Sequence, residues 1–313
     1  MLAKQHETRL RIRHMNPVAR DQRRLAWILL MPWILGFLAF SLYPTAASLY
    51  FSFTRYNLFE PPHWIGLANY ESIISSGTFW QSLYNTIYYT VFGVGFALVL
   101  GLGSALLLNL KVRGQAIYRT IYFLPSVMPP VASALLWLWL LNPQYGLINT
   151  ALGYLHLPQP LWLISAVWAK PALILMGLWG TGTTTIIYLA GLQDIPQVYY
   201  EALEMDGGGS WQKFRYITLP MLSPITFFQL VMGLIGALGL FTTAYVLSMG
   251  SIQSLGGPDN SLLFYSVNIY EQAFSNLKMG YASALAWILL IITVLITWII
   301  YRSSKRWLYY GGQ

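Results

Sequence analysis

The chain has 313 residues, of which 56% are hydrophobic and only 9% are charged. Soluble domains carry about 25% charged residues, so this composition excludes a soluble globular protein and indicates an integral membrane protein. The net charge of +8 does not indicate a nucleic-acid partner, because the basic residues gather at a few points along the chain. Cysteine is absent, which excludes disulfide frameworks and thiolate metal sites.

The first 24 residues form a basic segment with seven Lys or Arg side chains and two acids. The apolar run that follows, Leu25–Thr54, is too long for a signal peptide, and no small-residue cleavage site closes it. We therefore predict a basic tail over 1–24 that lies beside anionic lipid. The next part, 25–81, is predicted to contain a first membrane span over Ala26–Tyr50 and an external loop.

Charged residues bracket the further apolar runs, and a helical span needs roughly 20 apolar residues. The predicted spans are Leu83–Leu110, Ile121–Leu141, Pro171–Leu192, Ile225–Met249 and Ala282–Tyr301. We expect Asn142–Ala169 to be an external loop, since Pro158 and Pro160 interrupt any continuous helix there. Residues 82–301 are thus predicted to form a core of five transmembrane helices, followed by a C-terminal tail over 302–313.

The positions of the basic residues predict the orientation, because cytoplasmic loops of membrane proteins are enriched in Lys and Arg. With six spans, the two termini and the loops after the second and fourth spans share one side. That side holds 15 of the 18 basic residues, and the other side holds Arg55, Lys170 and Lys278. Both tails and the loop around Glu201 are therefore predicted to be cytoplasmic.

The stretch Glu201–Pro220 is the longest polar segment of the second half. It belongs to the loop between the fourth and fifth spans, and we name residues 196–222 of this loop the handle. Pro196 suits a first helical position, and Gln197–Met205 contains good helix formers. Gly207 and the two glycines after it should end that helix, because glycine enters left-handed backbone without strain. Ser210 is expected to cap a second short helix, so the handle is predicted to be two helices joined by a glycine turn.

The handle also carries a motif. The residues that carry it are Glu201, Ala202, Asp206, Gly207, Ile217, Leu219 and Pro220. In their order and spacing the segment resembles the EAA loop found in the permeases of ABC importers. Leu203 replaces the usual alanine of that motif, and Gly208 replaces a common alanine. In the family this loop forms the coupling helix that sits in a groove of the ATP-binding subunit. The alternative for the handle is an ordinary amphipathic connector between two spans.

Further stretches resemble the same family, among them Gly66–Tyr70, Leu124-Pro125, Pro129-Pro130 and Gly280–Ala284. The resemblance covers about Gly66–Tyr301 and is greatest to the maltose and glycerol-phosphate type. It implies an all-α membrane protein with six transmembrane helices, the type I ABC importer permease fold and a cytoplasmic coupling helix. The partners it implies are a second homologous permease, two ATP-binding subunits, an external solute-binding protein and the lipid bilayer, with transport by alternating access.

Several kinds of chemistry are not predicted. The sequence contains no GxxxxGK[ST] loop, so we expect neither an ATPase site nor a catalytic residue in this chain. The four histidines lack the paired spacing of metal ligands, and we predict neither a metal nor a cofactor. An ion-coupled secondary carrier is one alternative, which the lack of clear buried charges in the spans disfavours. A membrane assembly protein without transport activity is another, but no polar cluster near a span end supports it.

Substrate contacts are predicted in the fourth and fifth spans, because the family's pathway runs through them. The candidates offer hydrogen-bonding groups or an aromatic face for a sugar: Trp179, Thr181, Thr183, Gln229, Thr242 and Thr243. The alternative is that the small and polar residues allow close helix contacts, and that the aromatic residues anchor the spans at the interface. We thus predict a permease subunit in the cell (inner) membrane for import of a sugar or sugar derivative.

Overall fold

The structure is a computed structural model that describes residues 17–110, 112–249 and 256–309. The chain falls into two compact units, 1–51 and 52–313. The first unit is helical and consists of α1 (Pro17–Phe37), the π turn η1 (Leu38–Leu42) and nearly all of α2 (Tyr43–Ser52). The stretch Leu25–Ser52 is long and apolar enough to cross a membrane, which confirms the first predicted span.

Three spans of the second unit are long enough to cross a membrane without a sharp bend. α4 (Gly77–Leu108) is the second span, which begins at Gly77 rather than at the predicted Leu83. α13 (Ser223–Leu238) and α14 (Thr242–Met249) together form the fifth span, as predicted. α16 (Met279–Ser304) is the sixth and is slightly longer than predicted at both ends.

The third predicted span, Ile121–Leu141, is wrong as a straight helix. The chain forms α5 (Gln115–Phe123) and the 3-10 turn η2 (Leu124–Val127), and then turns by 98° into α6 (Pro130–Leu140). The residue before a proline is disfavoured in the helical region. Met128 and Pro129 each precede a proline, and both have extended ψ angles, 136° and 137°, which produce the turn.

The fourth span is also bent, and it begins earlier than predicted. α8 (Ala166–Trp179) and α9 (Gly182–Gln193) meet at an angle of 47°. At the bend, ψ rises to 12° at Gly180 and 4° at Thr181, outside the helical range. The end of the predicted external loop Asn142–Ala169 therefore belongs to α8, and a further helix, α7 (Leu147–Tyr154), lies within that loop. The described residues contain six spans if each bent pair is one span.

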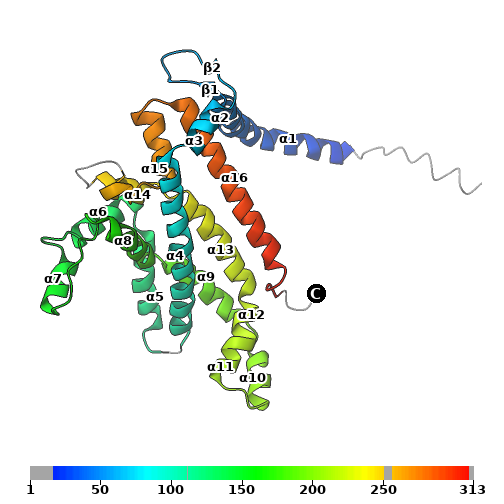
Figure 1. The fold of residues 1–313 in the computed structure, drawn as a ribbon. Helices are drawn as coiled ribbons and strands as arrows, with labels where there is room; N and C mark the ends of the chain where they lie inside the picture. The colour runs from blue at the N-terminus through cyan, green and yellow to red at the C-terminus, as the bar shows by residue number, and fades with distance from the viewer. Residues whose placement is uncertain (1–16, 111, 250–255, 310–313) are drawn as a thin grey trace, which may run out of the picture. The chain divides into compact units, whose positions relative to one another are not determined.

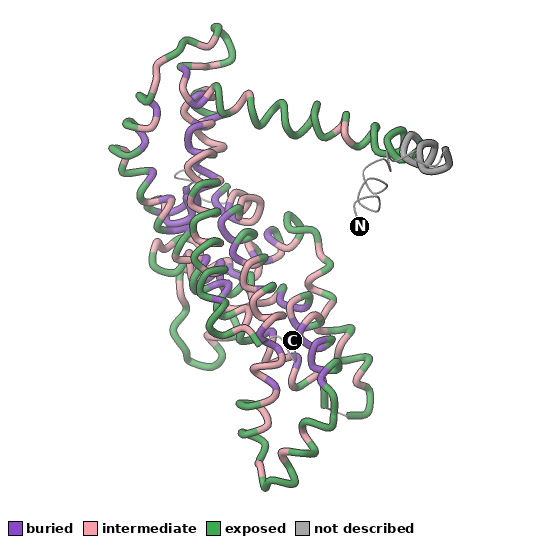
Figure 2. The backbone as a smooth tube through the Cα atoms, turned by 90° about the vertical axis from the view of Figure 1, so that its right-hand side faces the viewer, coloured by how far each residue is buried: buried purple, intermediate pink, exposed green. Residues whose placement is uncertain are grey.

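α4 lies at the centre of the second unit, where it packs against α8, α9, α13 and α15 (Tyr265–Tyr270) (Figure 1). Glycines stand where the helices approach closely. A Cβ atom on Gly101 would lie 2.6 Å from Cγ2 of Thr184 in α9, and one on Gly233 of α13 would lie 3.0 Å from Cγ1 of Val94. Small residues permit such close contacts between membrane helices. Many of the buried residues lie along the middle of the unit (Figure 2).

Short elements occupy the two ends of the second unit (Figure 1). One end holds β1 (Thr54–Arg55), β2 (His63–Trp64), α3 (Ala68–Ile74), η4 (Pro258–Asn260), α15 (Tyr265–Tyr270) and the π turn η5 (Glu271–Ser275). The two strands pair antiparallel, Thr54 with Trp64 and Arg55 with His63. The opposite end holds the handle, which comprises α10 (Gln197–Met205), α11 (Ser210–Lys213), the π turn η3 (Phe214–Thr218) and α12 (Leu219–Met221).

The close contact of α4 with α9 predicts a difference between two glycines of the same helix. Gly101→Leu should lower the free energy of unfolding by about 1–3 kcal/mol, because the added side chain meets Thr184 in a packed contact. Gly103→Leu is the matched control, since nothing lies within 4 Å of a Cβ atom there. Unfolding of the purified protein in detergent measures both variants, and equal stabilities would contradict this packing.

Candidate functional site

The first helix of the handle forms as its sequence predicts. α10 covers Gln197–Met205. The prediction that Pro196 is the first helical residue is wrong. Pro196 is the N-cap, with an extended ψ of 130°. A φ of −60° suits proline in both positions, and only the ψ angle distinguishes them. At the other end, Gly207 has a φ of +79°, which confirms the predicted left-handed turn.

The turn after α10 is a Schellman motif. The amide of Gly207 donates a hydrogen bond to the carbonyl of Glu204 at 3.0 Å, and the amide of Gly208 donates one to the carbonyl of Leu203 at 2.8 Å. These bonds satisfy two carbonyl groups that a helix end otherwise leaves without a partner. The Cγ atom of Leu203 lies only 2.5 Å from where a Cβ atom on Gly208 would stand. The two departures from the motif therefore fit each other.

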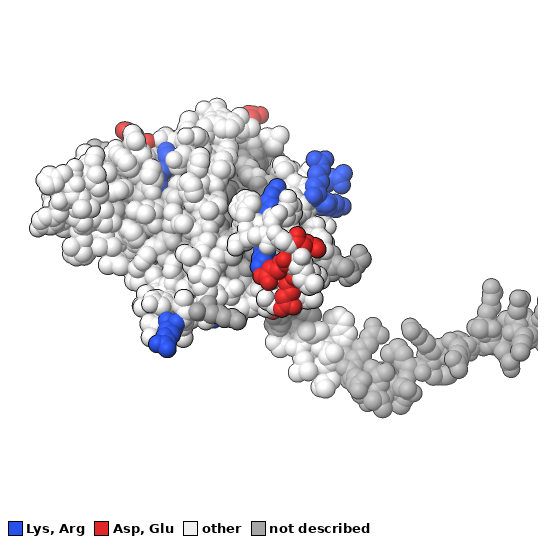
Figure 3. Space-filling view, turned by 90° about the horizontal axis from the view of Figure 1, so that it is seen from below, with Lys and Arg blue, Asp and Glu red and all other residues white. Residues whose placement is uncertain are grey.

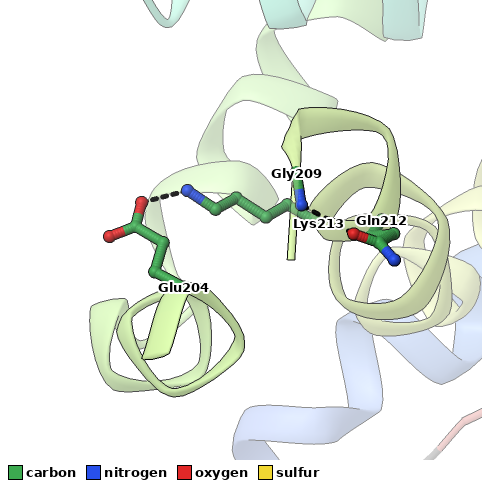
Figure 4. Close-up of polar contacts among 4 residues, drawn as sticks. All are labelled: Glu204, Gly209, Gln212 and Lys213. Atoms are coloured by element: carbon green, nitrogen blue, oxygen red, sulfur yellow. Dashed lines mark hydrogen bonds and ion pairs between the residues drawn. The ribbon is translucent and has the colours of Figure 1, made fainter. Parts of the chain in front are cut away.

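The second helix of the handle starts one residue earlier than predicted. Gly209 is its N-cap and Ser210 its first residue, so the prediction that Ser210 caps the helix is wrong. The amide of Gly209 donates to the side-chain oxygen of Gln212 at 2.6 Å (Figure 4). A glutamine three residues after the N-cap can reach back in this way, which removes the need for a capping serine. The helical path then continues through η3 and α12 to Met221.

Two contacts hold the helices of the handle together. Lys213 forms an ion pair with Glu204 across the turn (Figure 4). Because both side chains are partly exposed, we assign this pair a positioning role, since surface ion pairs stabilise by only about 0–1 kcal/mol. Nearer the spans, the hydroxyl groups of Tyr200 and Thr218 share a hydrogen bond of 3.0 Å. The helices of the handle are therefore linked across the turn and again nearer the spans.

The structure divides the seven predicted coupling residues into two groups. Glu201, Ala202, Asp206 and Gly207 are exposed at the tip of the handle, residues 197–211. Ile217, Leu219 and Pro220 are half-buried in its base, residues 214–222. At the base, Ile217 packs against a cluster that includes the buried side chains of Leu192, Ile195 and Leu222. The tip is thus free to contact a partner, while the base is packed against the spans.

The tip combines exposed apolar side chains with acidic ones. Met205 is 90% exposed and Trp211 is 71% exposed. Three acids, Glu201, Glu204 and Asp206, are exposed on the same segment. Seen from the handle end, most of the visible acidic side chains gather in one group, with basic side chains beside them (Figure 3).

A cavity of about 180 Å³ lies between α4, α8, α9 and α13. Gln229 is the one predicted substrate residue that lines it, and its amide donates to the carbonyl of Thr184 at 3.1 Å. The sequence did not indicate Tyr89, which also lines the cavity, because its place there depends on how α4 packs. Gly233 and Gly236 belong to the wall formed by α13.

The other five candidates do not line this cavity. The ring of Trp179 packs edge-on against Trp137, with the ring centres 5.7 Å apart. Thr181 is buried at the bend of the fourth span, where its hydroxyl contacts the carbonyl of Leu178 at 2.9 Å and the hydroxyl of Tyr122 at 3.0 Å. Thr183 is exposed, and Thr242 and Thr243 are half-buried at the start of α14. All five stay predictions.

Comparison with known proteins identifies the family. The family of binding-protein-dependent transport system inner membrane components matches residues 93–309. The chain belongs to this family. It is therefore a permease, the membrane subunit of a binding-protein-dependent ABC importer, as the handle motif predicted.

Relatives match the permease over nearly its whole length. A probable ABC transporter permease of Bacillus subtilis strain 168, YesP, is 41% identical over 297 residues, which cover 94% of each chain. The trehalose/maltose transport system permease MalF of Thermococcus litoralis is 32% identical over 287 residues, 91% of this chain and 95% of the relative. A crystal structure of a bacterial ABC transporter involved in import of the acidic polysaccharide alginate has a TM-score of 0.80 at 24% identity. That match covers 93% of this permease and 99% of its counterpart, which confirms the predicted fold class.

Lys170 of the permease lies inside a span, which the sequence did not predict. Because α8 begins at Ala166, Lys170 is part of the bent fourth span rather than the loop before it. Its amino group donates to the side-chain oxygen of Asn85 at 3.1 Å, and lies 5.3 Å and 5.7 Å from the ring centres of Tyr84 and Tyr88. An amide and two ring faces thus stabilise this cation, and within the described residues it has no acidic partner.

The fit between Leu203 and Gly208 predicts that these positions are coupled. Gly208→Ala should loosen the turn, because the added methyl group meets the Leu203 side chain. Adding Leu203→Ala should restore part of the loss, with a coupling energy of about 0.5–3 kcal/mol. Hydrogen exchange of the amides of residues 203–209 measures the opening free energy in the four proteins of the cycle. Additive effects of the two substitutions would contradict the packing.

Proposed function

We propose that this permease imports a sugar or sugar derivative, with energy from ATP hydrolysed by separate subunits. Family membership supports the import role, and a relative that matches 91% of the chain is named for trehalose and maltose. The proposed assembly contains a second homologous permease, two ATP-binding subunits and an external solute-binding protein. Because the sequence has no phosphate-binding loop, we infer that the permease has no ATPase site of its own.

The handle is the proposed coupling site. Its tip offers Met205, Trp211 and exposed acids to a groove of the ATP-binding subunit, at the end of the unit beyond α4 and α5 (Figure 1). Its base packs through Ile217 and Leu222 against residues at the end of α9. A movement of the ATP-binding subunit would therefore shift α9 and α13 with the handle, and so change access to the path between the spans.

Gln229 is the proposed substrate contact that the geometry supports best among the six candidates. It lies in the cavity that α9 and α13 help to form, and these helices flank the handle in the chain. An amide can both donate to and accept from a sugar hydroxyl. The alternative of an ion-coupled carrier finds little support, since Lys170 is held by neutral groups and forms no ion pair with an acid among the described residues.

The proposed orientation places the handle and both termini in the cytoplasm, and it can be tested by labelling. A single cysteine at Ser275, in η5, should react with a membrane-impermeant maleimide from outside intact cells. A cysteine at Ser210, in the handle, should react only after the cells are opened. Both residues are exposed, so accessibility on one side of the membrane alone decides the result. Labelling of position 210 in intact cells would refute the orientation and the coupling role.

The function is tested by reconstitution of the complete transporter in proteoliposomes. Uptake of trehalose or maltose should depend on ATP and on the binding protein, and the purified permease alone should not hydrolyse ATP. Gly207→Val should keep the complex assembled but strongly reduce both uptake and stimulated ATPase activity. The left-handed backbone disfavours valine by about 1–2 kcal/mol, which misplaces the tip without affecting the packed spans.

Gly209→Thr is the matched control for Gly207→Val. Gly209 has a φ of −82°, which any residue adopts, and threonine has nearly the size of valine and suits an N-cap. Uptake by this variant should stay near that of the wild type. Normal uptake by Gly207→Val would refute the proposed coupling geometry, and loss of the protein itself would show that Gly207 serves folding. ATP-dependent uptake of amino acids but not of sugars would refute the substrate class.

A further inference from the structure

A second and larger cavity, of about 730 Å³, lies at the end of the second unit opposite the handle. Its walls come from β1 and the residues after it, α3, the start of α4, α15, η5 and the start of α16. The volume is within the range of specific ligand sites, about 300–1,000 Å³. Neither the handle nor the cavity around Gln229 shares a residue with it. We name it the outer pocket.

One wall of the outer pocket is a ladder of three side-chain amides. Asn268, Gln272 and Asn276 follow one another at intervals of four residues along α15 and η5, and all line the pocket. The Gln272 amide donates to the side-chain oxygen of Asn268 at 3.5 Å, and the Asn276 amide donates to that of Gln272 at 3.3 Å. At the buried end, Asn268 donates to the hydroxyl of Ser82 in α4 at 3.3 Å. The ladder is therefore hydrogen-bonded to α4, a membrane span.

The outer pocket is also positively charged. Arg55 and Lys278 line it, and no acidic residue is among its described lining residues. Neither cation forms an ion pair within the part of the chain that the structure describes. These are two of the three basic residues on the predicted external side, so most of the basic charge on that side is gathered at one cavity.

The backbone around both cations is held in place. The side-chain amide of Asn69 donates to the carbonyls of Ser52 and Thr54 at 2.8 and 2.9 Å, which fixes the strand that carries Arg55. The amide of Lys278 donates to the carbonyl of Gln272 at 2.8 Å, which ties it to the ladder. The amide of Gly280 donates to the carbonyl of Tyr56 at 3.2 Å and joins the two segments. The charges therefore belong to one preformed site.

We propose that the outer pocket receives an acidic surface loop of the external solute-binding protein. The two unpaired cations would pair with carboxylates, and the amide ladder would hydrogen-bond the peptide groups of the loop, because amides both donate and accept. The pocket lies at the end opposite the proposed coupling site, where a binding protein has to dock. A neutral sugar has no charge to match Arg55 and Lys278. This inference rests on the proposed function, because it assumes an external protein partner.

The test uses the complete transporter in proteoliposomes made of phosphatidylcholine, with its solute-binding protein added outside at increasing concentration. The double variant Arg55→Gln, Lys278→Gln should need about threefold to tenfold more binding protein for half-maximal ATPase stimulation, with the maximal rate retained. The difference from the wild type should shrink at about 0.5 M salt, where charges are screened within a few ångströms. The control variant Lys305→Gln, Arg306→Gln also removes one lysine and one arginine, but at the other end of α16, and should match the wild type.

An unchanged half-saturating concentration in the double variant would refute the docking proposal alone. Absence of any stimulation in the wild type would refute the proposed function, and the docking proposal with it. Phosphatidylglycerol in the liposomes should not alter the difference between variant and wild type, and a difference that appears only with this anionic lipid would assign the pocket to a headgroup and overturn the proposal. If the double variant fails to assemble, the single variant Lys278→Glu, at an exposed position, should raise the half-saturating concentration of binding protein by at least as much as expected for the double variant.

Discussion

The contacts between α4, α9 and α13 are the interaction on which the rest of the second unit depends. Gly101 lets α9 approach α4, and Gly233 lets α13 approach α4 from another side. The Gln229 amide, hydrogen-bonded to the carbonyl of Thr184, joins α9 to α13. In a membrane the hydrophobic effect does not drive one helix onto another, so close packing and such hydrogen bonds have to hold them together. The handle follows α9 and precedes α13, and its position is therefore set by this packing.

The two ends of the second unit differ in how they can meet a partner. At one end the handle projects with exposed acids and with Met205 and Trp211 uncovered. At the other end the outer pocket is concave, basic and lined with amides. The proposed function requires a response to a separate ATPase and to an external binding protein, and the proposed sites assign one end to each. The packed helices between them give a physical route for the response.

The sequence predicted the fold class and the handle well, because both depend on local patterns. Apolar runs of span length can only be buried as helices in a bilayer, since every backbone polar group needs a partner there. The turn at Gly207 was predictable because the left-handed backbone favours glycine. The prediction that Ser210 is an N-cap was wrong, although serine is a good N-cap in general. Here the Gln212 side chain accepts a hydrogen bond from the Gly209 amide, and the helix starts one residue earlier. The sequence shows the Pro129-Pro130 pair, but neither the bend before Pro130 nor its angle of 98° was predicted.

The sequence by itself determined that this is a membrane protein with several apolar spans, since composition and the spacing of charged residues are properties of the chain alone. Its resemblance to the EAA loop predicted a permease, and the family comparison confirmed that prediction. Only the tertiary structure decided which polar residues meet. It left Gln229 at a cavity and placed Thr181 in a helix contact. It also brought Arg55 and Lys278, 223 positions apart in the chain, to one pocket. The physical reason is that helix packing brings together residues far apart in the chain, and no local pattern records which faces will meet.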